Sequence, residues 1–361
     1  MQNYKNVVEN FIHNEILSKT GEVYFDFSKE EDFLYHELDF IGKNLCQDYV
    51  KGPSSFYIID SVRVQAVAIH NHKIVLVFKG MLEQIFRTAA MMVGAERRDK
   101  ESDEIFYEPW FDNVNLWING GEFEWTSNEY WWLHDQEYRK AFDILVEALF
   151  IFLVLHEIGH LHNLHGERRN DNNEECVSPI DNITFIHKAI EDNEEMDEAE
   201  RLNSHAREIV ADTFAFQFMM SELKESLFPN SEYEGTDSAT LTAINFGVCI
   251  YAVASYLWAL SFRYNSESST HPPHVFRLAS IEAACLEHRV CGGDEKLTIL
   301  GLEIGMRSYL KKMTCICNSN EFVEWRNLKY TPANQEYYEK ICRIIPKWSN
   351  STFGVRDEDW L

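Results

Sequence analysis

The stretch "FIFLVLHEIGHLHNLHG", residues 150–166, joins a continuous apolar run to four histidines and a glutamate. On an α-helix residues four apart share a face, so His156 and His160 present both imidazoles to one point. That geometry suits a Zn²⁺ ion, and Glu157 is placed to act as a general base toward water. Because the apolar run predicts a buried helix, these polar groups are costly there unless something pairs them. We therefore expect a metal site, and not merely hydrogen-bonded core histidines.

The two other histidines of this stretch are His162 and His165. Residues 136–165 predict one unbroken helix that Gly166 ends. On such a helix His162 points away from the metal, and His165 could approach it only if the helix broke. We expect both to be polar residues at the surface or behind the ligands, and bystanders to the chemistry.

A third protein ligand is needed, since a catalytic zinc keeps three of them and one open position. The pattern HExxHxxGxxH is excluded by Asn163 and Gly166. In "HAREIVADTFAF", Glu208 and Asp212 are four apart on an amphipathic helix. Glu208 can therefore ligate the metal while Asp212 hydrogen-bonds the back of a zinc-bound histidine. His205 remains a competing ligand.

Four elements occur in the order that is typical of one group of metallopeptidases. They are "VQAVAIHNHKIVLVFKGML" (64–82), "HEIGH" (156–160), "EIVAD" (208–212) and "STHPPHVFRL" (269–278). Together they resemble the gluzincins of the CAAX prenyl endopeptidase and HtpX-type group. The resemblance implies a zincin-like (minimal gluzincin) core, Zn²⁺ as the cofactor, and hydrolysis of a protein or peptide substrate.

The resemblance also implies roles for single residues. Glu208 would be the third ligand, and His271 would approach the scissile carbonyl from the side opposite Glu157. Arg277 would lie behind the site and anchor the His271 loop or the substrate. An extended substrate would add to an edge strand, formed by Ile74, Val75, Leu76, Val77 and Phe78.

The pattern along the chain predicts an α+β fold that is predominantly α-helical. Residues 61–79 are β-branched, partly alternating and broken at "HNH", which indicates a hairpin or two adjacent strands. We expect an N-terminal helical extension (1–60), a metallopeptidase core (61–291) and a mostly helical C-terminal extension (292–361). The core carries an aromatic insertion (100–135) and an acidic insertion (167–204). These additions resemble those of the soluble phage-exclusion (Lit-like) peptidases, which implies a defence or regulatory role.

Charge and cysteine content bound the partners and the location. The formal net charge is −26, with 59 acidic against 33 basic residues, which disfavours nucleic acids and anionic membranes. The run from Glu191 to Glu200 is a solvated segment or, alternatively, a site for basic substrates or a regulatory partner. No CxxC pair and no secretory signal are visible, so we expect reduced thiols and a cytoplasmic protein. A metal site at Cys315 and Cys317 is a minor alternative.

One segment leaves a second location open. Residues 238–262 carry no charge and are long enough to span a bilayer, but they contain Ser, Thr and Asn throughout. We interpret them as a buried central helix. The leading hypothesis is thus a soluble zinc-dependent endopeptidase. The alternatives are a zincin-fold module that binds or senses without proteolysis, and a membrane-associated processing peptidase.

Overall fold

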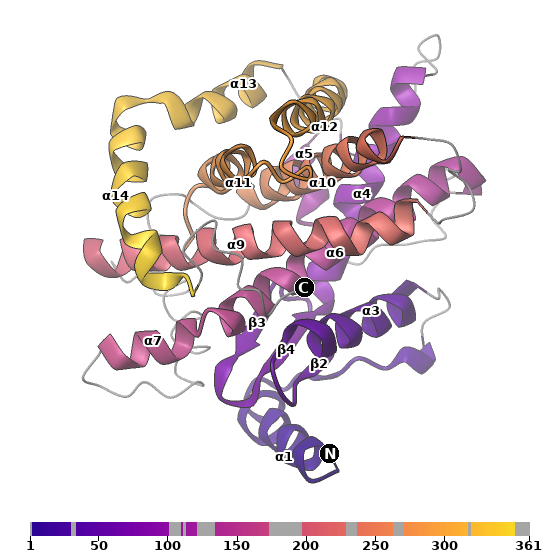
Figure 1. The fold of residues 1–361 in the computed structure, drawn as a ribbon. Coiled ribbons are helices and arrows are strands. Elements are labelled where there is room, and N and C mark those ends of the chain that lie inside the picture. Colours follow the sequence, from indigo (N-terminus) through magenta and orange to yellow (C-terminus); the bar gives the residue numbers. More distant parts are fainter. Residues whose placement is uncertain are drawn as a thin grey trace.

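A computed structural model describes most of the chain, and it confirms the α+β, predominantly helical class (Figure 1). The described residues are 2–29, 34–100, 110, 113–120, 134–172, 197–228, 237–262, 271–316 and 319–350. Most of the aromatic insertion and of the acidic insertion lies outside them, as does Cys317.

The sheet has four strands in the order β1-β2-β4-β3. β2 and β4 are parallel, and the other two pairs are antiparallel. β3 and β4 form the predicted hairpin, which turns at His70–His72. The strands are β1 (Val23–Tyr24), β2 (Ser55–Asp60), β3 (Ala66–Ile69) and β4 (Ile74–Phe78).

The prediction that β4 is the edge strand was wrong, because β4 lies between β2 and β3. Both of its faces are covered. Val75 and Val77 belong to the larger core cluster, whereas its other three side chains belong to a second cluster on the opposite face. A strand covered on both faces is continuously apolar, which explains the run "IVLVF". The edge strands are β1 and β3, and β3 is the one beside β4.

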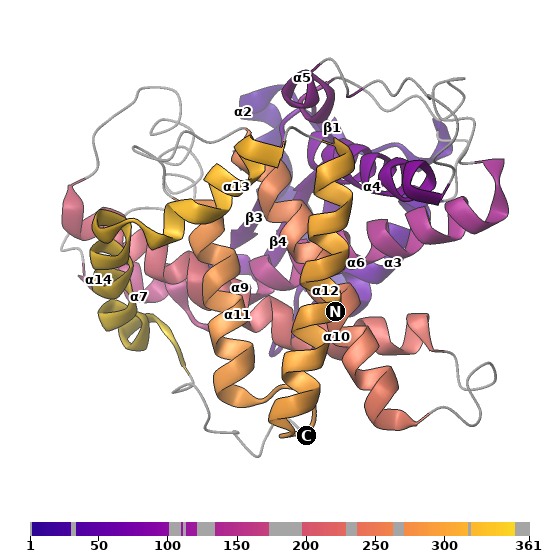
Figure 2. The same cartoon turned by 90° about the horizontal axis from the view of Figure 1, so that it is seen from above.

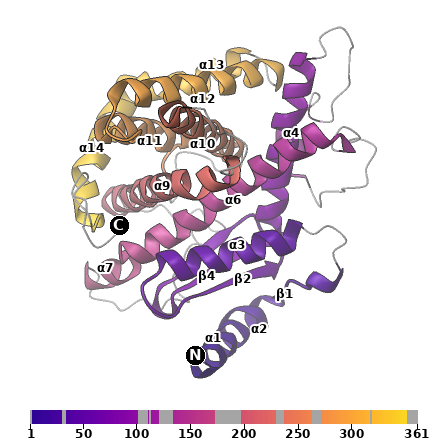
Figure 3. The ribbon, with the colours of Figure 1, turned by 45° about the vertical axis from the view of Figure 1, so that its right-hand side comes forward.

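The N-terminal residues contribute to this core. They form α1 (Gln2–Phe11), the π-helical segment η1 (Ile12–Leu17), α2 (Ser18–Thr20), the short 3₁₀ turn η2 (Phe27–Lys29) and α3 (Leu34–Tyr49). They also supply β1 and β2, half of the strands of the sheet. α1 and η1 pack on one face of the sheet, and α3 lies with α6 on the other (Figure 3). Residues 1–60 are therefore not a helical extension outside the core, because the short apolar segment "SFYIID" pairs with β4.

The remaining helices form layers above the sheet (Figures 1 and 2). α6 and α9 cross the middle of the molecule, and α10, α11 and α12 lie beyond them. α14 runs down one side and packs against α9. The helices are α4 (Lys79–Lys100), α5 (Val114–Ile118), α6 (Gln136–His162), α7 (His165–Asn172), α9 (Glu198–Leu227), α10 (Ser238–Ser261), α11 (His274–His288), α12 (Glu295–Ile316), α13 (Ser319–Asn327), the 3₁₀ turn η5 (Leu328–Tyr330) and α14 (Pro332–Trp348).

Within the described part of the chain, α10 is the one helix whose length and composition would allow it to cross a membrane. It is also largely buried, with 83% of its most apolar window inside the protein. The core helix of a soluble protein passes the same test, so the burial agrees with a central packing role.

The histidine-rich helix ends earlier than predicted. α6 stops at His162, and Leu164 adopts a left-handed conformation with φ 56° before α7 begins. The Asn163 side chain donates to the Gly159 carbonyl at 2.8 Å and so caps the last turn. Gly166 is not the stop. It lies inside α7, where a Cβ would come within 2.5 Å of the His70 ring.

Candidate metal centre

A close contact between α6 and α9 brings the two halves of the site together. A Cβ on Gly159 would lie 3.0 Å from the Ala211 Cα and 3.1 Å from its carbonyl oxygen, so the helices meet here almost backbone to backbone. Glu208 lies one turn before Ala211 on α9. This approach therefore places its carboxylate beside the two histidines of the HExxH segment.

Three side chains, two of them buried and that of His160 partly buried, converge on one point. His156 Nε2 lies 3.2 Å from His160 Nε2 and 3.3 Å from Glu208 Oε2. His160 Nε2 lies 3.4 Å from Glu208 Oε1. Each residue offers one ligand atom to the same small space, so the group could hold a metal ion.

The separations fit a tetrahedral cation site. Ligand atoms bonded to zinc at 2.0–2.1 Å stand about 3.3–3.4 Å from one another in a tetrahedron. Glu208 Oε2 is buried without a well-directed hydrogen bond, although His156 and His271 nitrogens lie 3.3 Å from it. The two imidazole nitrogens face each other across 3.2 Å, so either a proton on one of them or a metal ion must lie between them.

Without a metal, a proton on His156 meets this need. Burial alone would lower the pKa of His156, but the hydrogen bond to Asp212 and the nearby Glu208 carboxylate raise it to about 10. Burial lowers the pKa of His160 to about 3, which leaves this ring in the neutral form that binds metals. Metal binding would therefore displace a proton from His156.

Behind His156 lies a buried ionic pair. Asp212 Oδ1 is 2.9 Å from His156 Nδ1, and Arg277 donates to both Asp212 oxygens at 2.7 Å. Burial would raise the pKa of Asp212, but the Arg277 guanidinium reverses this and lowers it to about 2. Asp212 thus stays ionised and fixes the ring of His156. Arg277 is 3% exposed and holds Asp212, so it lies behind the site.

Glu157 points toward β3. The backbone N–H of Ala68 donates a hydrogen bond to its carboxylate. Burial raises the pKa of Glu157 to about 7, despite the lowering effects of His156 and of this hydrogen bond. A carboxyl group with this pKa can both accept and release a proton near neutral pH.

His271 approaches from the segment just before α11. Its Nε2 lies 3.3 Å from Glu208 Oε2, and its side chain is 27% exposed, more than those of the three candidate ligands. His271 therefore marks the open side of the site. His205, the competing ligand, instead lies with its Nδ1 3.0 Å from the hydroxyl of Tyr337 on α14.

The two histidines expected to be bystanders differ. His162 lies against Phe214, with ring centroids 4.9 Å apart. His165 is buried, and its Nδ1 lies 2.8 Å from Nδ1 of His160. It therefore does not stand apart from the site. On the predicted unbroken helix His165 could not have approached the site, and the break between His162 and His165 is what allows the contact.

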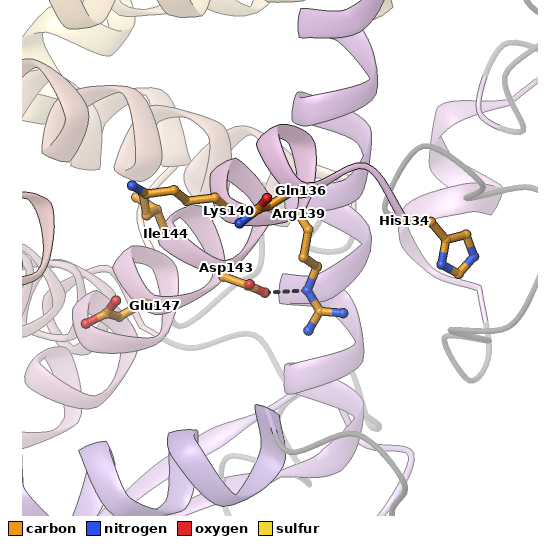
Figure 4. A pocket seen from close by; sticks show the side chains of 7 residues that line it. All are labelled: His134, Gln136, Arg139, Lys140, Asp143, Ile144 and Glu147. Atoms are coloured by element: carbon orange, nitrogen blue, oxygen red, sulfur yellow. Dashed lines mark hydrogen bonds and ion pairs between the residues drawn. The ribbon is translucent and has the colours of Figure 1, made fainter.

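A separate hollow lies at the other end of α6 (Figure 4). It measures about 580 Å³ and contains the ion pair of Arg139 with Asp143 at 2.8 Å. It is lined by residues of the first turns of α6 and by His134, two residues before the helix, and no predicted site residue is among them. The lining residues are His134, Gln136, Arg139, Lys140, Asp143, Ile144 and Glu147. This hollow is therefore separate from the candidate metal centre.

The comparison with protein families gives one match that bears on this geometry. Residues 81–285 match the model of the family named peptidase U49. The matched span contains the three candidate ligands, Glu157 and His271. The comparisons with curated proteins and with solved structures found no match.

Proposed function

Because this chain belongs to the peptidase U49 family, we propose that it is a zinc-dependent endopeptidase of the gluzincin type that cleaves a protein substrate. The convergence of His156, His160 and Glu208 beside a buried glutamate of raised pKa is the observation that carries this proposal. A zinc ion held by these three residues would polarise the scissile carbonyl and acidify a water molecule.

Glu157 moves the protons. In its ionised form it takes a proton from the attacking water, and it then delivers this proton to the leaving amine. In the metal-free protein burial raises the pKa of this carboxyl group to about 7, which suits a group that must both take and release a proton near neutral pH. The hydrogen bond from Ala68 keeps the carboxylate aimed while the proton moves.

His271 stabilises the charge that develops on the carbonyl oxygen. It lies on the open side of the site and can turn its Nε2–H from Glu208 toward a substrate oxygen. A donor aimed at a developing oxyanion lowers the barrier. His271 would therefore act from the side of the site that remains accessible.

The substrate would bind at the edge of β3. In the antiparallel pair, only every second residue of β3 forms backbone hydrogen bonds with β4. Ala66 and Ala68 are the residues in between, so their N–H and C=O groups point to the outer edge of the sheet. Ala68 already reaches Glu157 there. An extended peptide that pairs with Ala66 would therefore lie beside the general base.

The proposal also covers the cellular location, the class of substrate and the biological role of the peptidase. Buried free thiols at Cys46, Cys249 and Cys285 support a reducing cytoplasm. The excess of acidic residues supports a protein substrate and argues against nucleic acid. The resemblance to phage-exclusion peptidases supports a defence role, in which a regulatory partner would control cleavage.

The test compares Glu157→Gln with the wild type. The variant keeps every candidate ligand, so it should bind one equivalent of zinc but cleave nothing. Glu147→Gln, ten residues earlier on the same helix, serves as the matched control and should bind zinc and cleave. Mass spectrometry of cell proteins after induction of each chain identifies the products. Cleavage by Glu157→Gln, or a wild type without zinc, would overturn the proposal.

A further inference from the structure

The break between α6 and α7 connects the metal centre to the end of α14. His165 Nε2 lies 3.0 Å from the main-chain oxygen of Trp348, and its Nδ1 lies 2.8 Å from Nδ1 of His160. The imidazole of His165 thus connects the candidate ligand His160 to Trp348, which lies 183 positions after His165 in the chain.

The direction of these hydrogen bonds follows from their partners. A carbonyl oxygen only accepts, so Nε2 of His165 carries the proton. His165 is 3% exposed, and a doubly protonated ring would be a costly buried charge. Its Nδ1 therefore accepts from Nδ1–H of His160. That leaves Nε2 of His160 as a lone pair directed at His156 and Glu208.

The carbonyl of Trp348 is itself held in place. The Trp348 indole is buried, donates to Asn203 at 2.9 Å and lies under the Arg207 guanidinium at 4.7 Å. Both partners are on α9, the helix that bears Glu208. The ligand helix and the orienting carbonyl are thus tied to each other.

Residues 347–350, which we call the C-terminal clasp, are also tied to the broken end of α6. Arg168 donates to the Lys347 carbonyl at 2.8 Å. Asn350 N–H donates to the Asn163 side chain at 2.9 Å, and the Asn350 amide donates to the His162 carbonyl at 2.6 Å. These bonds hold the clasp against the two helix ends that flank Leu164.

We propose that His165 and the main-chain carbonyl of Trp348 position the ring of His160 for metal binding, so that the C-terminal clasp is a working part of the metal centre. This inference rests on the proposed function, because it needs a metal at His160. His165 is a positioning residue, since it acts through His160. Partners of this kind alter metal affinity by 10- to 100-fold when they are removed.

Two substitutions of His165 separate positioning from packing. In His165→Asn the amide oxygen can take the place of Nδ1, so His160 keeps its acceptor. In His165→Gln the amide nitrogen can take the place of Nε2, so the bond to Trp348 remains but the acceptor is lost. We expect zinc affinity to fall 10- to 100-fold in His165→Gln and only a few-fold in His165→Asn. His162→Gln is the neighbouring control and should bind as the wild type does.

The measurements are made on the full chain after removal of metal. Competition with a chelating dye gives the zinc affinity, and the visible spectrum with Co²⁺ reports the geometry of the ligands. Circular dichroism establishes that each variant is folded. A purely structural role for His165 would weaken both variants equally, and equal losses would overturn the inference, as would a His165→Gln variant that binds as tightly as the wild type.

A second variant tests the clasp without touching the ligands or His165. Arg168→Ala removes the donor to the Lys347 carbonyl and should lower zinc affinity in the wild type. In the His165→Gln background Arg168→Ala should not lower zinc affinity further, because the hydrogen bond from His160 to residue 165 is already lost. Additive losses would contradict the coupling. If the wild type itself bound no zinc, the proposed function would fail, which is a different outcome from either of these.

Discussion

Glu157 is a buried carboxyl group whose pKa is raised by burial and lowered by most of its neighbours. Burial raises its pKa to about 7, whereas an unfolded chain ionises its glutamates near pH 4.3. Between these values the folded protein holds a proton that the unfolded chain has released. The contribution of Glu157 to the stability of the metal-free protein therefore falls as the pH rises through this window and is constant above it.

We predict that Glu157→Gln stabilises the metal-free protein at pH 8. The gain should be about 3–4 kcal/mol, because the amide removes the cost of a buried charge and can still accept from Ala68. Urea unfolding in the presence of a chelator measures it. Near pH 4.3 the difference should vanish, and a gain of the same size at both pH values would show that it does not come from ionisation.

At this scale the sequence predicts those residues that share one helix face. His156 and His160 are four apart, as are Glu208 and Asp212, and the structure places each pair as that spacing requires. For His165 the sequence left two positions open, at the surface or behind the ligands, and the structure shows the second. The sequence could not decide between them, because the contact depends on the left-handed conformation of Leu164, an ordinary residue with no turn signal. The periodicity of a helix gives no warning of such a break.

The contact between α6 and α9 is the element-scale feature on which the centre depends. We predict that Gly159→Ala lowers the free energy of unfolding by about 1–3 kcal/mol, because the new methyl group meets Ala211 backbone atoms at 3.0 Å and 3.1 Å. It should also weaken zinc binding, since the helices move apart. Thermal unfolding and dye competition measure the two effects. The double variant Gly159→Ala/Ala211→Gly should recover no more than part of either, because the clash includes the backbone.

The edge of β3 gives a second prediction at this scale. Ala66→Pro removes an N–H from the outer edge, while the ladder to β4 runs through the neighbouring residues. Cleavage of the cellular substrate should fall at least about ten-fold if that N–H makes one of the main-chain bonds to the peptide. Zinc affinity should not change. Undiminished cleavage would show that the peptide binds elsewhere.

Element types were easier to predict than their neighbours. The apolar alternation of residues 61–79 indicates the hairpin, but the sequence does not say that "SFYIID" pairs with β4 and makes it an inner strand. Pairing between segments far apart in sequence is set by tertiary packing. The sequence of a six-residue apolar strand does not indicate which other strand it pairs with. The strand predicted to lie at the edge, β4, is therefore one strand further inward.

For the whole molecule, zinc and folding should be linked. The ligands lie on two different helices, and His160 and Glu208 are 48 positions apart in the chain, so only the folded state presents all three together. We predict that a free zinc concentration of 1,000 times the dissociation constant raises the free energy of unfolding by about 4 kcal/mol. Glu157→Gln should gain as much, whereas His160→Ala should gain far less. Urea unfolding with and without chelator gives these values, and equal gains in all three proteins would place the zinc elsewhere.

The distance between His165 and Trp348 along the chain has a consequence for folding order. A contact that closes a loop of this size forms late, because the chain must first order the intervening helices. During synthesis from the N-terminus, the HExxH helix exists well before the segment that orients its second histidine. In a nascent chain His160 would therefore still lack its contact with Trp348 through His165. We expect such a chain to be inactive as a peptidase until residue 348 has left the ribosome and this contact has formed.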